Sequence, residues 1–311
     1  MKVGIIGAGA VGSSCAKSMI LRGSCHEIVL LDSNNKRANG VAFDLSHGAV
    51  LCPSTYIRAG DYKDLAGASI VVITAGVNER KGNAIDRKDP KGRLRLLGKN
   101  AKIYDKIIPR LKSVTANAII LVVTDPPDPL ADIVRRHTKS NPILSSGTFL
   151  DTLRFRLQLA QKLDCHPLSV DALVLGEHGT SQVYVWSSAQ IGGIPIQEHI
   201  SRRRLNQAQF RSEVEEAVKF ANIKIIEGTR ASQHGIGVVI ARLVEAMLRN
   251  ERLVAPIGVF SEKYSVTLSL PTVIGRGGVL KVLDPVLSVQ ESKALVNSAK
   301  VIATALADLG I

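Results

Sequence analysis

Short apolar runs alternate with stretches of helical spacing along the first half of the 311-residue chain. The apolar runs are continuous and rich in β-branched residues, as is typical of strands that are covered on both faces. Strands are predicted at residues 3–7, 27–32, 69–74 and 118–123, and helices at residues 11–21, 35–43 and 94–111. This alternation predicts a parallel sheet with crossover helices, and therefore an α/β fold class.

The pattern changes after about residue 145. Amphipathic stretches predict helices at residues 150–163, 211–226, 235–248 and 289–309, and strand-like runs lie at residues 173–175, 183–187 and 267–270. We therefore expect a doubly wound N-terminal domain over residues 1–145 and an α+β domain over residues 146–311. No linker separates them, so the two domains should pack tightly.

The composition describes an ordinary globular protein, with 45% hydrophobic and 22% charged residues. No apolar run reaches the ~20 residues that a membrane span needs. The net charge is +13, but the basic residues are dispersed, so we expect no membrane and no nucleic-acid partner. The four cysteines are scattered, which predicts reduced thiols and no metal site. Because the N-terminal segment reads as a strand and not as a signal peptide, we expect a cytoplasmic protein.

A glycine-rich turn, Gly-Ala-Gly-Ala-Val-Gly, follows the first predicted strand at residues 7–12. In such a G-x-G-x-x-G pattern the backbone can approach a pyrophosphate at the helix N-terminus, as in a Rossmann domain. Asp32 ends the second strand, where a carboxylate binds the adenosine ribose and disfavours a 2′-phosphate. This predicts NAD as the cofactor. The expected contacts are Gly7, Gly9, Ala10, Val11, Gly12 and Asp32.

Other residues should line the same crevice, because the carboxyl ends of parallel strands meet at one edge of a sheet. Ala75 and Gly76 follow the strand at residues 69–74, and Asp125 follows the strand at residues 118–123. The further cofactor contacts that we expect are Ala75, Gly76, Val123 and Ser146.

A histidine lies between two glycines in the sequence Gly176-Glu177-His178-Gly179, just after an apolar run. Asp151 and Arg154 stand three residues apart in the helix predicted upstream. A histidine with such neighbours is suited to proton transfer, since the carboxylate can orient the ring and the arginine can bind an anionic substrate.

Together, these motifs resemble the L-lactate/malate dehydrogenase family over essentially the whole chain, and most closely its L-lactate and L-2-hydroxyisocaproate types. The resemblance rests on residues 7–12, 60–68, 146–156, 176–179 and 270–275. It implies an NAD-dependent oxidoreductase that interconverts small 2-hydroxy and 2-oxo acids by hydride transfer. It also implies a homo-oligomer, either a dimer or a tetramer.

The resemblance also implies a role for each matching residue. His178 would be the general acid and base, and Asp151 would orient it. Arg154 would bind the substrate carboxylate through two hydrogen bonds, which a lysine cannot reproduce. Arg93 would polarise the substrate carbonyl when a mobile loop closes. Ser232 stands where the family has a substrate-contacting threonine.

Two departures affect the choice of substrate. The family has asparagine where this chain has Asp125, and an ionised carboxylate can only accept a hydrogen bond. We therefore expect Asp125→Asn to raise kcat/KM for small 2-oxo acids. The loop at residues 77–92 is also longer than in the usual members of the family. One position of this loop selects the substrate in the family. Counted back from Arg93, that position is Arg87, and an arginine there implies a dicarboxylate such as malate. Glu177, by contrast, is typical of lactate-type members.

The resemblance favours the L-lactate type of the family but leaves two alternatives open. Arg87 and the long loop suit a malate or branched-chain 2-hydroxy-acid dehydrogenase. Asp125 would suit an NAD-binding sensor with little catalysis, although such a protein would not need the complete proton relay.

Overall fold

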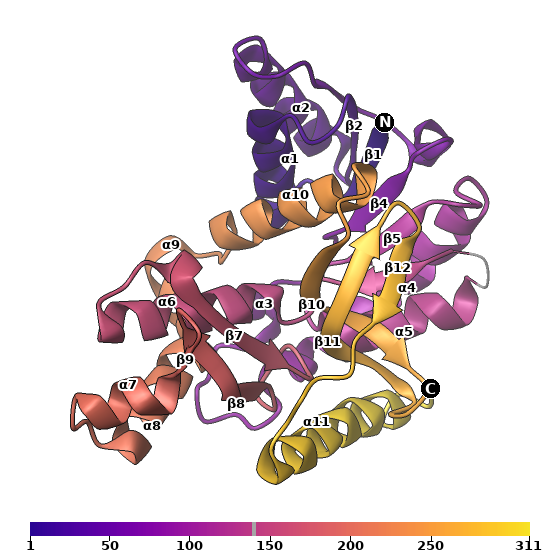
Figure 1. The fold of residues 1–311 in the computed structure, drawn as a ribbon. Coiled ribbons are helices and arrows are strands. Elements are labelled where there is room, and N and C mark those ends of the chain that lie inside the picture. The colour runs from indigo at the N-terminus through magenta and orange to yellow at the C-terminus, as the bar shows by residue number, and fades with distance from the viewer. Residues whose placement is uncertain (139–140) are drawn as a thin grey trace.

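The computed structural model describes residues 1–138 and 141–311. Its central feature is a nine-stranded sheet in the order β12-β11-β10-β6-β5-β4-β1-β2-β3 (Figure 1). Six of these strands are parallel: β1 (Lys2–Ile6), β2 (Glu27–Leu31), β3 (Tyr56–Ala59), β4 (Ile70–Ile73), β5 (Ile119–Val122) and β6 (Ile143–Ser145). The order of β1 to β6 is that of a Rossmann domain, which confirms the predicted α/β class.

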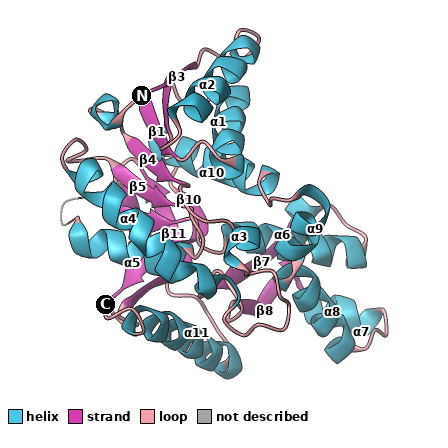
Figure 2. Ribbon diagram, turned by 180° about the vertical axis from the view of Figure 1, so that it is seen from behind, coloured by secondary structure: helices cyan, strands magenta, loops and turns pink. Residues whose placement is uncertain are grey.

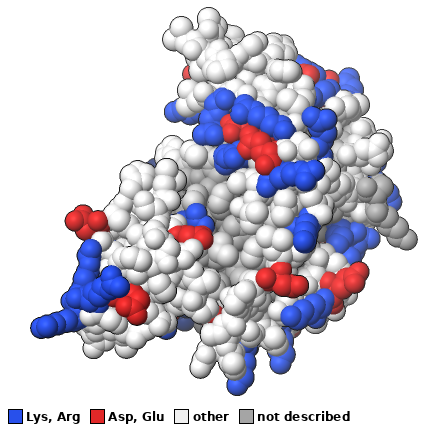
Figure 3. All heavy atoms as spheres, viewed as in Figure 1, with Lys and Arg blue, Asp and Glu red and all other residues white. Residues whose placement is uncertain are grey.

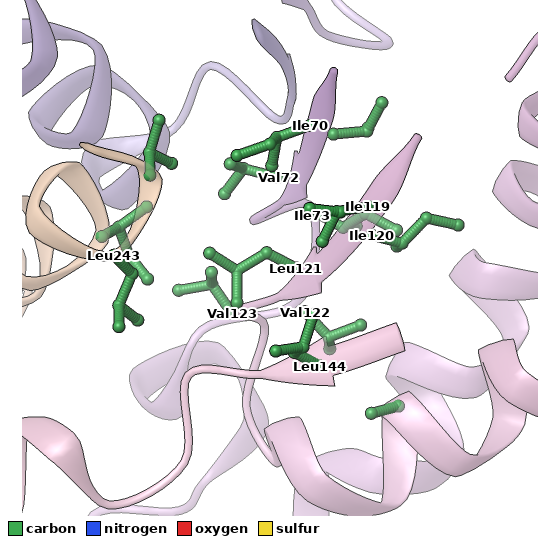
Figure 4. Close-up of a cluster of buried hydrophobic side chains, with 14 of the residues drawn as sticks. Ile70, Val72, Ile73, Ile119, Ile120, Leu121, Val122, Val123, Leu144 and Leu243 are labelled. Carbon is green, nitrogen blue, oxygen red and sulfur yellow. The ribbon is translucent and has the colours of Figure 1, made fainter. Parts of the chain in front are cut away.

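Helices cover both faces of this parallel sheet (Figure 2). They are α1 (Ala10–Arg22), α2 (Asn35–Ala49), α4 (Leu97–Lys112), α5 (Pro127–His137) and α10 (His234–Leu248). Every residue of β4 and β5 is buried, and Leu243 of α10 packs against the cluster that they form with Leu144 (Figure 4). Burial on both faces explains why these strands are apolar throughout.

A smaller unit follows the parallel strands. Its antiparallel sheet consists of β7 (Val170–Leu175), β8 (Val183–Ile191) and β9 (Ile194–Pro195). The helices around it are α6 (Phe149–Leu163), α7 (Ile196–Arg202), α8 (Gln207–Lys219) and α9 (Ala221–Thr229). This unit has its own apolar core, in which Phe155 and Trp186 meet edge to face. The helix α11 (Val289–Ala307) closes the described chain.

Three of the predicted elements differ in the structure, which also contains elements that the pattern did not predict, among them β3, β6, α5 and α7. The helix predicted at residues 211–226 is two helices, α8 and α9, which are separated at Phe220. The start of the helix predicted at residues 94–111 is a 3₁₀ turn, Gly92–Leu96, which precedes α4. The third difference concerns the strand predicted at residues 267–270, which was expected to belong to the second domain. It is part of β11 (Val266–Gly275). With β10 (Leu253–Ser261) and β12 (Gly278–Val282), it extends the first sheet through the β6–β10 pairing.

The surface carries its positive charge in separate groups. On the face shown in Figure 3, Lys and Arg side chains are interleaved with Asp and Glu side chains and do not form one continuous stripe. Within residues 1–138 and 141–311, no helix combines the length and apolar character that a bilayer crossing requires.

The contact between α1 and α10 holds the C-terminal half of the chain against the Rossmann sheet. A Cβ atom added at Gly237 of α10 would lie 2.8 Å from the backbone oxygen of Ser14. Glu245, on the same helix, accepts hydrogen bonds from Arg22 Nε at 2.7 Å and from Ser24 Oγ at 2.9 Å. The two helices therefore meet at close range beside a partly buried ionic contact.

Gly237→Ala should lower the free energy of unfolding by about 1–3 kcal/mol, because the helices must move apart to admit the methyl group. Gly228→Ala is the matched control, since Gly228 is also helical and no atom lies within 4 Å of its added Cβ. The control should be neutral or gain up to about 1 kcal/mol from helix propensity. Equilibrium urea unfolding measures both, and equal effects would contradict this account.

Candidate active site

A cavity of about 490 Å³ lies where the carboxyl ends of the parallel strands face the second half of the chain. Most of the residues predicted for cofactor or substrate lie in its wall: Gly9, Ala10, Val11, Gly76, Arg93, Val123, Asp125, Ser146, Arg154, His178 and Ser232. Gly7, Gly12, Asp32, Ala75 and Asp151 are not in the wall itself. The structure does not place Arg87 there. One cavity thus unites both predicted halves of the site.

The glycine turn at the start of α1 forms one end of this cavity. A Cβ atom at Gly12 would lie 1.8 Å from the backbone oxygen of Gly7, so only glycine permits this approach of helix and strand. A Cβ atom at Gly9 would meet no atom within 4 Å, which leaves open space beside the helix N-terminus. The first turn of α1 carries no acidic side chain. This end therefore fits the anionic pyrophosphate of a dinucleotide.

Asp32 braces the same turn from the end of β2. Its carboxylate accepts hydrogen bonds from Ala8 N and from Asn34 N, each at 2.8 Å. Arg37 also lines the cavity, and its Nη1 lies 3.8 Å from Asp32 Oδ2. The carboxylate is thus held where an adenosine ribose would lie in a Rossmann domain.

The other end of the cavity contains a histidine–aspartate pair. His178 Nδ1 lies 2.5 Å from Asp151 Oδ2, and Arg154 Nη1 donates to Asp151 Oδ1 at 3.0 Å. Burial alone would raise the pKa of Asp151, but His178, Arg154 and Arg93 together hold it well below its usual value. The ionised carboxylate fixes Nδ1 as the protonated ring nitrogen, which leaves Nε2 free to exchange a proton in the cavity.

The backbone of His178 is fixed by Asp128, a buried residue that sequence reasoning missed. Asp128 Oδ2 accepts from His178 N at 2.8 Å, and Asp128 Oδ1 accepts from Ser145 Oγ at 2.5 Å. Burial raises the pKa of Asp128 to about 7, although both hydrogen bonds oppose the rise. In the sequence, Asp128 stands out only as an acidic residue three positions after Asp125. It lies in α5, a helix that the apolar pattern did not predict.

Arg93 and Asp125 meet beside the histidine. Arg93 Nε lies 3.3 Å from Asp125 Oδ2, and His178 Nε2 lies 3.7 Å from Asp125 Oδ1. Arg93 is buried, and its Nε has no hydrogen-bond partner among the described residues. Burial alone would lower the pKa of Arg93, but nearby acids raise it above its ordinary value. These acids are Asp125, Asp151, Glu79 and Glu177.

The long loop is attached to the second half of the chain. Arg87 turns away from the cavity and contacts Glu227 of α9 at 3.1 Å. Thr180 Oγ1 donates to the backbone oxygen of Pro90 at 2.9 Å. The loop residues that do line the cavity are Val77, Asn78, Glu79 and Lys81. Counting back from Arg93 could not identify them, because the inserted residues change the register.

Glu177, the residue before the histidine, is almost completely buried. Its Oε2 accepts from Ser181 N at 3.0 Å and from Ser181 Oγ at 2.5 Å. Its backbone nitrogen donates to Ser298 Oγ at 2.8 Å, which ties the histidine segment to α11. Glu177 therefore helps to position the segment and does not itself line the cavity.

Comparison with known families matches both halves of the chain. The NAD-binding domain model of lactate/malate dehydrogenases matches residues 1–144, and the alpha/beta C-terminal domain model matches residues 148–309. The chain belongs to the lactate/malate dehydrogenase family. It is therefore an NAD-dependent oxidoreductase, as the motifs predicted. No metal-binding group of three or more His, Cys, Asp or Glu occurs in the described part of the chain.

Individual relatives of this dehydrogenase family align over the full length. An L-lactate dehydrogenase from Deinococcus radiodurans is 39% identical over 100% of both chains. One from Thermus aquaticus is 38% identical, again over 100% of both. The crystal structure of a lactate dehydrogenase from a Medee basin deep-sea metagenome library has a TM-score of 0.91 at 34% identity. It covers 100% of this chain and 99% of that one.

Asp151→Asn should lower kcat/KM for 2-oxo-acid reduction by about 10²-fold or more, because the amide no longer stabilises the protonated imidazole. NADH affinity should stay unchanged, since the glycine turn is separate from this pair. Asp164→Asn, an exposed acid at the end of the same helix, is the matched control. Steady-state kinetics and NADH fluorescence titration test this. Full activity in Asp151→Asn would contradict the assigned proton relay.

Proposed function

We propose that this chain is an NAD-dependent L-lactate dehydrogenase that interconverts pyruvate and L-lactate. The observation that carries the proposal is the His178–Asp151 pair, whose histidine lines one cavity with two arginines and the glycine turn at the start of α1. The relatives that align over the full chain are named L-lactate dehydrogenases, which supports pyruvate as the 2-oxo acid.

The residues divide the work between proton transfer and substrate binding. NAD, when bound, accepts or supplies the hydride. His178 gives a proton from Nε2 to the ketone oxygen of pyruvate and takes it back from the hydroxyl of lactate. Asp151 stabilises the imidazolium in both directions. Because Asp151 engages only one Nη atom of Arg154, the rest of that guanidinium is free to hold the substrate carboxylate.

Arg93 and Ser232 complete the substrate end. Arg93 lines the cavity together with His178, and its guanidinium lies beside Asp125, so its positive charge can stabilise the negative charge that develops on the ketone oxygen. The Ser232 hydroxyl can contact the substrate across the same cavity.

The two halves of the chain have separate roles in this proposal. Residues 1–145 form the NAD-binding domain, with Gly7, Gly12, Ala75 and Asp32 shaping the walls of the cofactor site. Residues 146–311 form the catalytic domain. The four free cysteines fit a reducing compartment, so we place the protein in the cytoplasm.

The argument for a dicarboxylate substrate depended on Arg87, which pairs with Glu227 instead of lining the cavity. We therefore expect pyruvate to be reduced with a higher kcat/KM than oxaloacetate, 2-oxoisocaproate or phenylpyruvate. NADH oxidation with each of the four acids measures this. Preference for oxaloacetate would contradict the lactate assignment, and no turnover with any of them would contradict the enzyme assignment.

The chain also carries exposed apolar side chains on three helices that lie along one side of the molecule in Figure 1 and Figure 2. Phe43 of α2 is 69% exposed, Val238 of α10 is 51% exposed and Leu157 of α6 is 42% exposed. Exposed apolar side chains mark an interface where they form one contiguous patch. We propose that a second copy of the chain covers these helices in a homo-oligomer.

Val238→Glu should shift the oligomer towards monomer, because the charge would be buried at the interface. Val286→Glu is the matched control, since Val286 is also exposed but lies between β12 and α11. Size-exclusion chromatography with light scattering gives the mass of each. A monomeric wild-type protein, or equal masses in the wild type and both variants, would contradict this interface.

A further inference from the structure

A second large cavity lies between the loop that carries Arg93 and the helix α11. Its volume is about 750 Å³, and it shares no lining residue with the active-site cavity. One wall is formed by residues between positions 82 and 99, from the loop and the start of α4, and the other by residues between positions 297 and 309. We call this cavity the loop–helix groove. Its volume is typical of cavities that bind small molecules.

Apolar side chains line the loop–helix groove from both walls. Leu94 and Leu97 belong to the wall formed by the loop and α4. Val301 of α11 and Leu309, just after this helix, belong to the opposite wall. A Cβ atom added at Gly98 would lie 3.6 Å from Leu309 Cδ2, so Leu309 packs over the start of α4 and closes one end of the groove. An apolar chain that filled the groove would remove this surface from water, which is favourable.

Lysine side chains give the same groove an excess of positive charge. Lys91, Lys99 and Lys300 line it, whereas Asp308 is the one acid among its described lining residues. Arg95 lines the groove as well, but it is already paired with Asp89. A lysine stem can lie along an apolar surface while its ammonium group stays in water. The groove therefore suits a ligand with an apolar body and an anionic head group.

The loop–helix groove adjoins both segments that carry catalytic side chains. On its loop wall, Lys91 lies two residues before Arg93. On its other wall, α11 holds the histidine segment, because Ser298 Oγ accepts a hydrogen bond from the backbone nitrogen of Glu177 at 2.8 Å. A ligand that joins the two walls would therefore hold Arg93 and His178 in their present positions.

We propose that the loop–helix groove binds a free long-chain carboxylate, whose chain lies on the apolar residues and whose carboxylate contacts the lysines. The bound carboxylate joins the loop to α11 and stabilises the position of Arg93 beside Asp125 and His178. Because the ligand binds one arrangement of the loop, that arrangement becomes more populated when the groove is filled. Binding at this site does not depend on which 2-oxo acid the active site reduces.

The test uses decanoate below its micelle concentration, titrated by calorimetry into the NADH complex of the full chain. Decyl maltoside has the same chain without a charge, and inorganic phosphate has a charge without a chain. Lys300→Glu reverses one charge of the groove, and Thr304→Trp fills part of its volume. Lys293→Glu is the matched control, because Lys293 is exposed on the same helix but does not line the groove. Circular dichroism checks that each variant is folded.

Decanoate should bind the wild type and Lys293→Glu with the same Kd, and about tenfold or more weakly to Lys300→Glu and Thr304→Trp, because like charge and lost volume oppose it. Decyl maltoside and phosphate should bind the wild type more weakly than decanoate does. Bound decanoate should also slow the amide hydrogen exchange of residues 82–99 in the wild type and the control.

Three results would each overturn the site: no binding of decanoate to the wild type, equal Kd values in all four proteins, or unchanged exchange at residues 82–99. Binding of decyl maltoside as tightly as decanoate would overturn the role of the carboxylate. None of these measurements uses turnover, so failure of this site is distinguishable from failure of the lactate assignment.

Discussion

The contact between His178 and Asp151 is the constraint on which the rest of the site depends. It joins a segment after β7 to the helix α6, and it requires an ionised carboxylate to remain buried. Burying a carboxylate is costly unless charged partners surround it, which explains the presence of Arg154 and Arg93. The same arginines are the groups that an anionic substrate needs. The arginines that stabilise the buried carboxylate of Asp151 are thus the same ones that would bind the substrate.

The imidazole of His178 is held in place only if the backbone of this residue is fixed as well. The Asp128 carboxylate accepts a hydrogen bond from the backbone nitrogen of His178, and the Ser298 hydroxyl accepts one from the backbone nitrogen of Glu177. These contacts come from α5 and α11, elements far apart in the sequence. They explain why the large sheet and the smaller catalytic unit have to pack together before the site exists.

Local sequence was sufficient for the features whose chemistry is local. The glycine turn, Asp32, and the apolar runs that became β1, β2, β4 and β5 follow from spacing and burial on both faces. Residue chemistry suggested that His178, Asp151 and Arg154 act together, and motif resemblance then implied the role of each. By contrast, the extension of the sheet by β10 to β12 could not be predicted, because antiparallel pairing across the two halves leaves no periodic signal.

The loop shows the other limit of sequence reasoning. Arg87 looked like a specificity residue by counting, yet it pairs with Glu227. Glu79 reaches the substrate end because Asn100 fixes the start of the loop against β5. That contact depends on a side chain in α4 that no motif marks. Asp125 was recognised as unusual from the sequence, but only the structure placed it between Arg93 and His178.

Isotope transfer tests the central assignment most directly. The chain is incubated with pyruvate and NADH that carries deuterium at both C4 positions, and the product is analysed by chiral chromatography with mass spectrometry. The account predicts L-lactate with one deuterium at C2. D-lactate, lactate without deuterium, or no lactate at all would contradict it.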